Sequence, residues 1–247
     1  MLSDGLHRVS ETIRSKFSQI DKLISNVKKV FNKAPARIRL FRQIAPELSL
    51  PPKPIITRWG TWLEAAFYYA HNFEKVKQVI DQLDSSEAHS IKMSQILFSK
   101  PKLKQDLIFI LANCEDFTST ITKLNSSTLK LTESIELIEN LEKKFENSNI
   151  EVVKIANDKM KNILGKNQGF KTLSLISKIL KNEKSFQELT VDYEIDEIRS
   201  FKYAPITSCK VERTFSKYKS ILSYDRKNLL FENLKMLFIC YCNDNLD

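Results

Sequence analysis

The sequence predicts a mostly α-helical protein, a multi-helix bundle with one short strand. Only 4 Gly and 7 Pro occur in 247 residues, so few positions favour tight turns. Apolar residues recur every three or four positions over most of the chain, which is the period of a helix with one buried face. Hydrophobic residues make up 42% of the chain and aromatic residues 10%, a composition typical of globular domains.

The first quarter of the chain predicts two or three helices and then the strand. A helical pattern runs over residues 3–32 and is compatible with a break near Ser18. Pro35 suits the first turn of a further helix, where its missing N–H needs no partner, and Pro46 would end that helix. After a proline-rich extended stretch, residues 55–59 are predicted as the only strand.

From Gly60 onward the pattern is helical almost to the end. A long amphipathic helix is predicted to run through Leu83, and its aromatic residues are interpreted as core. These aromatic residues are Trp62, Phe67, Tyr68, Tyr69 and Phe73. The later helices are predicted at 87–99, 101–124, 126–146, 150–164, 169–182, about 208–222 and about 228–243. The acidic and aromatic segment 183–203 carries no clear pattern. Because a lone strand leaves its backbone groups unpaired, no sheet is expected.

Positive charge is concentrated near the two ends of the chain. The net charge is +9, and seven basic side chains with no acidic one lie between Lys22 and Arg42. A surface of one sign attracts polyanions, and nucleic acid is the usual one. The alternative is a solvated helix surface. The candidates in this segment are Lys22, Lys28, Lys29, Lys33, Arg37, Arg39 and Arg42.

Cysteine and histidine spacing predicts no metal site and no cofactor. The four cysteines show no C-x-x-C spacing, and none lies near a pair of histidines, so neither a zinc site nor a disulfide framework is expected. Free thiols fit a reducing interior. No apolar run approaches the roughly 20 residues that cross a bilayer, and the start lacks the apolar core of a signal peptide. We therefore expect a soluble intracellular protein without a membrane partner.

Two stretches resemble hAT-family transposases. APITSCKVERTFSKYKSIL (204–222), with Arg226 and the helix after it, resembles the carboxy-terminal dimerisation segment of that family. ITRWGTWLEAAFYYAHNFEKV (56–76) resembles its Thr-Arg-Trp block. The resemblance implies a remnant of an RNase H-like domain at 1–59, a helical insertion domain at 60–200 and a dimerisation region at 201–247. It also suggests kinship with host proteins grouped with the CGG triplet repeat-binding protein.

The resemblance also identifies one candidate catalytic residue. In the family, three carboxylates hold two divalent metal ions, and Glu212 matches the third of them. Ahead of Thr57 the only Asp residues are Asp4 and Asp21, and both lie in helical pattern and not at strand ends. One carboxylate cannot hold two metals. We therefore expect an inactive protein that lacks most of the catalytic sheet and the amino-terminal zinc finger, with Glu212 stabilising a helix start.

Trp59, beside Arg58, matches a family tryptophan that lies near the DNA hairpin or flipped base. An aromatic ring next to a cation suits base stacking. A buried Trp between a strand and a helix is the alternative. Arg58 and Trp59 thus join the DNA-binding candidates.

The last two helices each carry an apolar stripe. The stripes are Val211, Phe215, Tyr218 and Leu222, and Leu230, Leu234, Leu237, Phe238 and Tyr241. The resemblance implies that they pack against the insertion domain and a second subunit, although their spacing equally allows closure within one chain.

The expected function is dimerisation of an inactive transposase-derived protein with itself or a related hAT-type chain, in a nuclear, DNA-associated or transcriptional setting. The alternative location is the cytoplasm. The alternative functions are a nucleic-acid-binding module built on residues 22–42, and a transposase or nuclease active only with a missing amino-terminal half.

Overall fold

The computed structural model describes residues 2–55, 60–125, 129–189, 193–204, 206, 215, 218–222 and 230–243. These residues are mostly α-helical, as predicted, and they contain no strand. Of the predicted strand 55–59, only Ile55 lies in the described part, and it is not in a strand. Its backbone N–H donates to Thr61 Oγ1 at 3.0 Å, so a side chain satisfies a group that a sheet would otherwise pair.

The N-terminal helices follow the prediction closely. The pattern over residues 3–32 breaks at Lys16 and Phe17, and Pro35 opens the third helix at its first position. The three helices are α1 (Leu2–Ser15), α2 (Ser18–Phe31) and α3 (Pro35–Ile44).

The long helix predicted from Gly60 to Leu83 is wrong, because the structure divides it into two. Asn72 separates them with φ −114° and ψ 21°, and its side-chain amide donates to the Tyr68 carbonyl at 2.9 Å. Because ψ at Asn72 lies outside the α-helical range, the helical repeat is interrupted at this residue. The two helices are α4 (Gly60–His71) and α5 (Phe73–Asp81).

The remaining helices lie close to the predicted segments. They are α6 (His89–Phe98), α7 (Pro101–Leu124), α8 (Leu131–Glu146), α9 (Glu151–Lys166), α10 (Gln168–Leu180) and α13 (Phe231–Asn243). The segment 183–203 contains three short elements: η1 (Phe186–Glu188), α11 (Ile195–Ser200) and η2 (Phe201–Tyr203). Of the predicted helix 208–222, the described residues 215 and 218–221 are helical.

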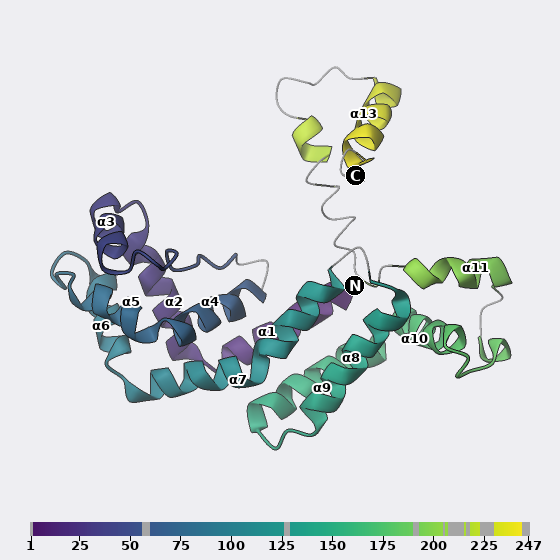
Figure 1. Ribbon diagram of the computed structural model, residues 1–247, viewed down its shortest axis with the longest axis horizontal. Coiled ribbons are helices and arrows are strands. Elements are labelled where there is room, and N and C mark those ends of the chain that lie inside the picture. The colour runs from purple at the N-terminus through teal and green to yellow at the C-terminus, as the bar shows by residue number, and fades with distance from the viewer. Residues whose placement is uncertain are drawn as a thin grey trace.

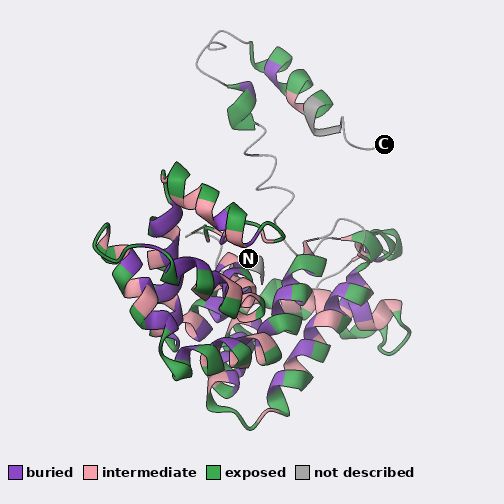
Figure 2. Ribbon diagram, turned by 60° about the vertical axis from the view of Figure 1, so that its left-hand side comes forward, coloured by how far each residue is buried: buried purple, intermediate pink, exposed green. Residues whose placement is uncertain are grey.

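The body of the molecule is elongated, with α1 and α7 near its middle (Figure 1). Helices α2 to α6 form one end, and α8 to α11 form the other. The closest helix pairs are α4 with α7, α1 with α9, and α2 with α6. One continuous core of buried side chains runs from Leu6 to Ile206 (Figure 2).

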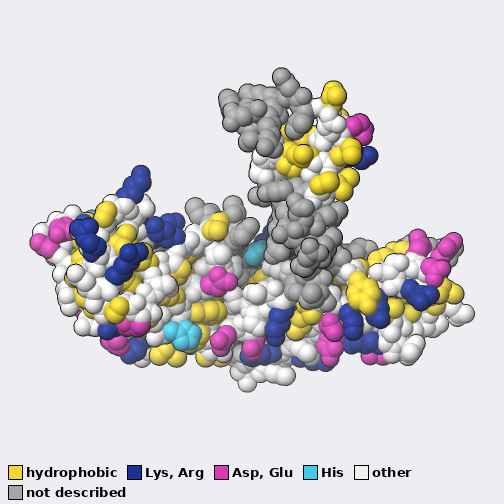
Figure 3. All heavy atoms as spheres, turned by 45° about the horizontal axis from the view of Figure 1, so that its top comes forward, with side chains coloured by type: hydrophobic (Ala, Val, Ile, Leu, Met, Phe, Trp, Pro, Cys, Tyr) yellow, Lys and Arg dark blue, Asp and Glu magenta, His cyan; other side chains and the backbone are white. Residues whose placement is uncertain are grey.

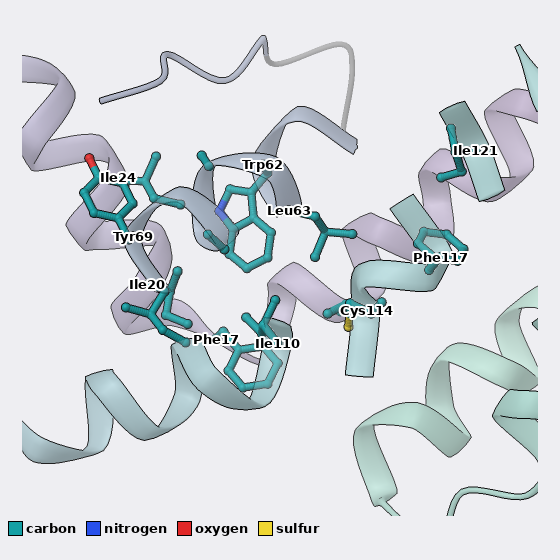
Figure 4. Close-up of a cluster of buried hydrophobic side chains, with 14 of the residues drawn as sticks. Phe17, Ile20, Ile24, Trp62, Leu63, Tyr69, Ile110, Cys114, Phe117 and Ile121 are labelled. Carbon is teal, nitrogen blue, oxygen red and sulfur yellow. The ribbon is translucent and has the colours of Figure 1, made fainter. Parts of the chain in front are cut away.

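In one part of this core, side chains of α2, α4 and α7 meet (Figure 4). Trp62 and Tyr69 of α4 are buried there, and Phe73 of α5 is buried against Phe98 of α6, which confirms their interpretation as core residues. Phe67 and Tyr68 are partly buried and pack against the same core. The interpretation of the aromatic cluster as structural is therefore correct.

Candidate interaction surfaces

The C-terminal pair, defined here as residues 218–222 together with α13, has a small core of its own. The rings of Tyr218 and Phe238 meet edge to face, with centroids 5.5 Å apart. Ile221 and Leu234 are 4% and 9% exposed, and neither belongs to the main core. In Figures 1 and 2 the pair stands apart from the body. Its two segments therefore stabilise each other.

The outer surface of the C-terminal pair and of nearby Phe215 is unusually apolar. Leu230 and Phe231 are each 73% exposed, and Met236 is 65% exposed. More than half of the exposed large apolar side chains in the described part of the chain lie between residues 215 and 239. Figure 3 shows this gathering of hydrophobic side chains on the pair. Apart from exposed Glu232, Asn233 and Lys235, α13 is apolar on several sides, and such a helix is normally covered by other protein.

The structure divides the predicted dimerisation residues into two groups. Leu234 is buried and Phe238 partly buried within the pair. The exposed group comprises Phe215, Tyr218, Leu222, Leu230 and Leu237. Val211 and the side chain of Tyr241 lie outside the described residues.

Sequence reasoning missed several members of this surface. Phe231, Met236 and Ile239 are exposed, and Ile221 is buried. A helical period selects one stripe of a helix, whereas α13 is apolar on several sides. For Met236 and Ile239, the signal that could have found them is the unbroken apolar run from Met236 to Cys240.

The predicted basic surface lies on α2 and α3. We define the α2–α3 surface as Lys22, Lys28, Lys29, Lys33, Arg39 and Arg42. All are exposed except Lys28, which is half-buried, and within the described part of the chain none of the six forms an ion pair. Lys and Arg side chains gather over this end of the molecule in Figure 3. These cations are therefore free to meet an external anion.

Arg37 differs from its neighbours on this surface. Its guanidinium donates to Glu87 Oε2 at 3.1 Å and to the Val30 carbonyl at 3.2 Å. These bonds tie α3 to the end of α2 and to the loop before α6. Arg37 thus has a structural role, and the other two DNA-binding candidates, Arg58 and Trp59, lie outside the described residues.

The described residues contain no group of three or more His, Cys, Asp or Glu side chains that could hold a metal ion. Glu212 and the side chain of Asp4 are outside the described part. Asp21 accepts hydrogen bonds from Arg14 Nε at 2.7 Å and from Trp62 Nε1 at 3.1 Å. Its carboxylate is therefore engaged in linking helices.

The two described cysteines have different environments. Cys114 is buried beside α4 (Figure 4), and this burial raises the pKa of its thiol from 9.0 to about 12. Cys240 is exposed on α13. Cys209 and the side chain of Cys242 lie outside the described residues. None of the helices in the described part is both long enough and apolar enough to cross a membrane.

Comparisons of the chain with protein-family models, with curated proteins and with solved structures find no match.

Proposed function

We propose that this chain acts by self-association through its C-terminal pair, as a catalytically inactive protein derived from a hAT-type transposase. The observation that carries the proposal is the exposed apolar surface of α13, Phe215 and residues 218–222. The resemblance of residues 204–222 to a dimerisation segment points to the same part of the chain. The lack of catalysis rests on the sequence, in which only Glu212 matches a family carboxylate.

Physical chemistry favours a partner for this surface. A helix of 13 residues is marginal in water by itself, and its stability in proteins comes mainly from packing. Burying an exposed Leu, Phe or Met side chain is worth about 1.5–3 kcal/mol. A second copy presents the same surface, so a two-fold arrangement can cover Leu230, Phe231 and Met236 of both chains at once.

The test is the mass of the protein in solution, measured by size-exclusion chromatography with light scattering at micromolar concentration. We expect a dimer for the natural chain and a monomer for the double variant Met236→Glu/Leu237→Glu. Asn233→Glu, which adds one charge at an exposed polar position of α13, is the control and should remain dimeric. A natural chain that is monomeric at this concentration contradicts the proposal.

Catalysis has a separate test. We expect no metal-dependent cleavage of DNA by this chain with Mg²⁺ or Mn²⁺. Cleavage that the natural chain performs alone and that Glu212→Ala abolishes would overturn the inactive assignment.

The α2–α3 surface supports a second candidate function, the binding of nucleic acid, in a nuclear or alternatively a cytoplasmic setting. Its six cations carry no ion pair in the described part of the chain, and no acidic residue lies between Lys22 and Arg42. Contacts of Lys and Arg with phosphates release counterions, so the affinity falls steeply as salt rises. This candidate concerns the phosphate backbone of a duplex and needs no base contact.

A duplex-binding assay over a range of salt concentrations tests the second candidate. The triple variant Lys28→Glu/Lys29→Glu/Arg39→Glu should abolish binding. A matched triple variant on α9, Lys154→Glu/Lys159→Glu/Lys166→Glu, makes the same change in net charge at exposed positions away from this surface. Equal loss in both variants would show that only net charge matters and would remove the α2–α3 surface as a site.

A further inference from the structure

A groove lies at the other end of the body, between the start of α8, the end of α10 and the α11–η2 segment. It has a volume of about 850 Å³ and is lined by four basic side chains and one carboxylate. The basic residues come from three separate parts of the chain. They are Lys130, Lys181, Arg199 and Lys202.

Tyr203 forms part of the wall of this groove and is 66% exposed. The Nζ of Lys202 lies 5.4 Å from the centroid of the Tyr203 ring. An exposed tyrosine beside several cations is unusual for a side chain with only a packing role, because aromatic rings normally bury most of their area. The Lys202 ammonium lies over one face of the ring, and a ring that is 66% exposed still offers surface on which a nucleic-acid base can stack.

The backbone that carries Tyr203 is held by packing. Ile198 of α11 is buried, and η2 contacts both α8 and α10. Phe201, also in η2, meets the ring of Tyr193 edge to face with centroids 5.5 Å apart. Tyr203 is therefore presented from an anchored element.

Two of the four cations of the groove lie near a carboxylate. Arg199 Nη1 lies 3.5 Å from Asp196 Oδ1, and Lys181 Nζ lies 3.7 Å from Glu136 Oε2. Both are long contacts between solvent-exposed groups, and such pairs contribute little. The side-chain ammonium groups of Lys130 and Lys202 form no ion pair among the described residues, while the backbone N–H of Lys130 donates to Glu133 Oε2 at 2.9 Å.

We propose that this groove binds single-stranded nucleic acid, with Tyr203 stacking on a base and the four cations contacting the neighbouring phosphates. A single strand is indicated because the faces of bases in a duplex are already stacked on one another. The site is distinct from the α2–α3 surface, which lies at the opposite end of the body (Figure 1). The six residues that define the α2–α3 surface are all Lys or Arg.

The stacking contact is tested with the full chain and a fluorescent pyrimidine oligonucleotide of about 10 nucleotides, a length within the range that one site covers. Tyr203→Ala should weaken binding about tenfold, whereas Tyr203→Phe, which keeps the ring, should bind like the natural chain. After ultraviolet crosslinking and digestion with trypsin, mass spectrometry should find the nucleotide adduct on the peptide that begins at Tyr203. Unchanged affinity of Tyr203→Ala would overturn the inference.

The phosphate contacts are tested by Lys130→Gln/Lys202→Gln, which should lower the affinity and reduce its salt dependence. Lys154→Gln/Lys159→Gln on α9 is the matched control and should do neither. The charge-reversed α2–α3 variant should still bind the single strand. If that variant loses single-strand binding while Tyr203→Ala keeps it, the groove is not the site and the α2–α3 proposal stands. The inference would also be overturned if an acidic peptide bound as tightly as the oligonucleotide and Tyr203→Ala left the affinity for that peptide unchanged.

Discussion

At the residue scale, the carboxylate of Asp21 links three helices. It accepts from Arg14 of α1 and from the indole N–H of Trp62 of α4, while Asp21 itself belongs to α2. Trp62 is 2% exposed, so its N–H has little access to water. A buried donor that loses its acceptor costs more than an ordinary hydrogen bond contributes.

We expect Asp21→Ala to lower the free energy of unfolding by about 1–3 kcal/mol, measured by urea denaturation. In a Trp62→Phe background the same change should cost less, because the indole donor is already gone. Glu11→Ala, at an exposed position of α1, is the control and should stay within about 0.5 kcal/mol. Equal costs of Asp21→Ala in both backgrounds would show that the bond to Trp62 contributes nothing.

Cys114 should be unreactive in the folded protein. Its pKa is raised to about 12 by burial, and the thiolate is the form that reacts with iodoacetamide. Peptide mass spectrometry at pH 8 should find Cys114 alkylated in urea and protected without it. Because the pKa is raised in the folded state, this thiol's contribution to stability is complete below pH 9 and is lost as pH rises toward 12. Equal alkylation rates in the folded and unfolded protein would contradict the buried assignment.

At the element scale, most helices followed from apolar period and proline position. Pro35 and Pro101 open α3 and α7 as expected, because a missing N–H costs nothing in the first turn. The break at Asn72 was missed, since the apolar period continues across it and only the non-helical backbone angles of this one residue interrupt the helix.

The candidate surfaces were predictable to different degrees. The basic cluster on α2 and α3 follows from composition alone, but the engagement of Arg37 with Glu87 joins residues 50 positions apart and leaves no local signal. The groove around Tyr203 could not be predicted, because it unites Lys130, Lys181 and the α11–η2 segment, which carries no helical period. Tertiary packing, and not local propensity, brings these residues together.

The packing of α1 against α9 provides an element-scale prediction. A Cβ added at Gly5 would overlap Cγ2 of Ile163, and a β-branched side chain has little freedom to move away. We expect Gly5→Ala to destabilise the protein by about 1–3 kcal/mol in urea denaturation. Gly165, near the end of α9, has no such neighbour, so Gly165→Ala should instead stabilise by about 0.5–1 kcal/mol. Effects of the same sign would show that helices α1 and α9 do not approach as closely as described.

At the scale of the whole molecule, three surfaces lie on separate parts of one chain. The α2–α3 surface occupies one end of the body, the Tyr203 groove the other, and the C-terminal pair stands outside it (Figure 1). Self-association through the pair would bring two copies of each basic surface together. When one copy of a surface has bound a polyanion, binding of the second copy to the same polyanion is an intramolecular step. The overall affinity of the dimer is therefore higher than that of one surface.

This arrangement predicts that the body folds without the C-terminal pair. The main core extends from Leu6 to Ile206 and does not include Ile221 or Leu234, so a chain of residues 1–206 keeps every side chain of that core. We expect it to unfold in urea at the same midpoint as the monomeric double variant of the full chain, and to be a monomer by light scattering. A chain of residues 1–189 loses buried Ile198 and the contacts of η2 with α8 and α10, and should be less stable. If residues 1–206 instead aggregate or unfold while the monomeric full-length variant remains stable, the apolar residues of α13 cover the body of their own chain and not a second copy.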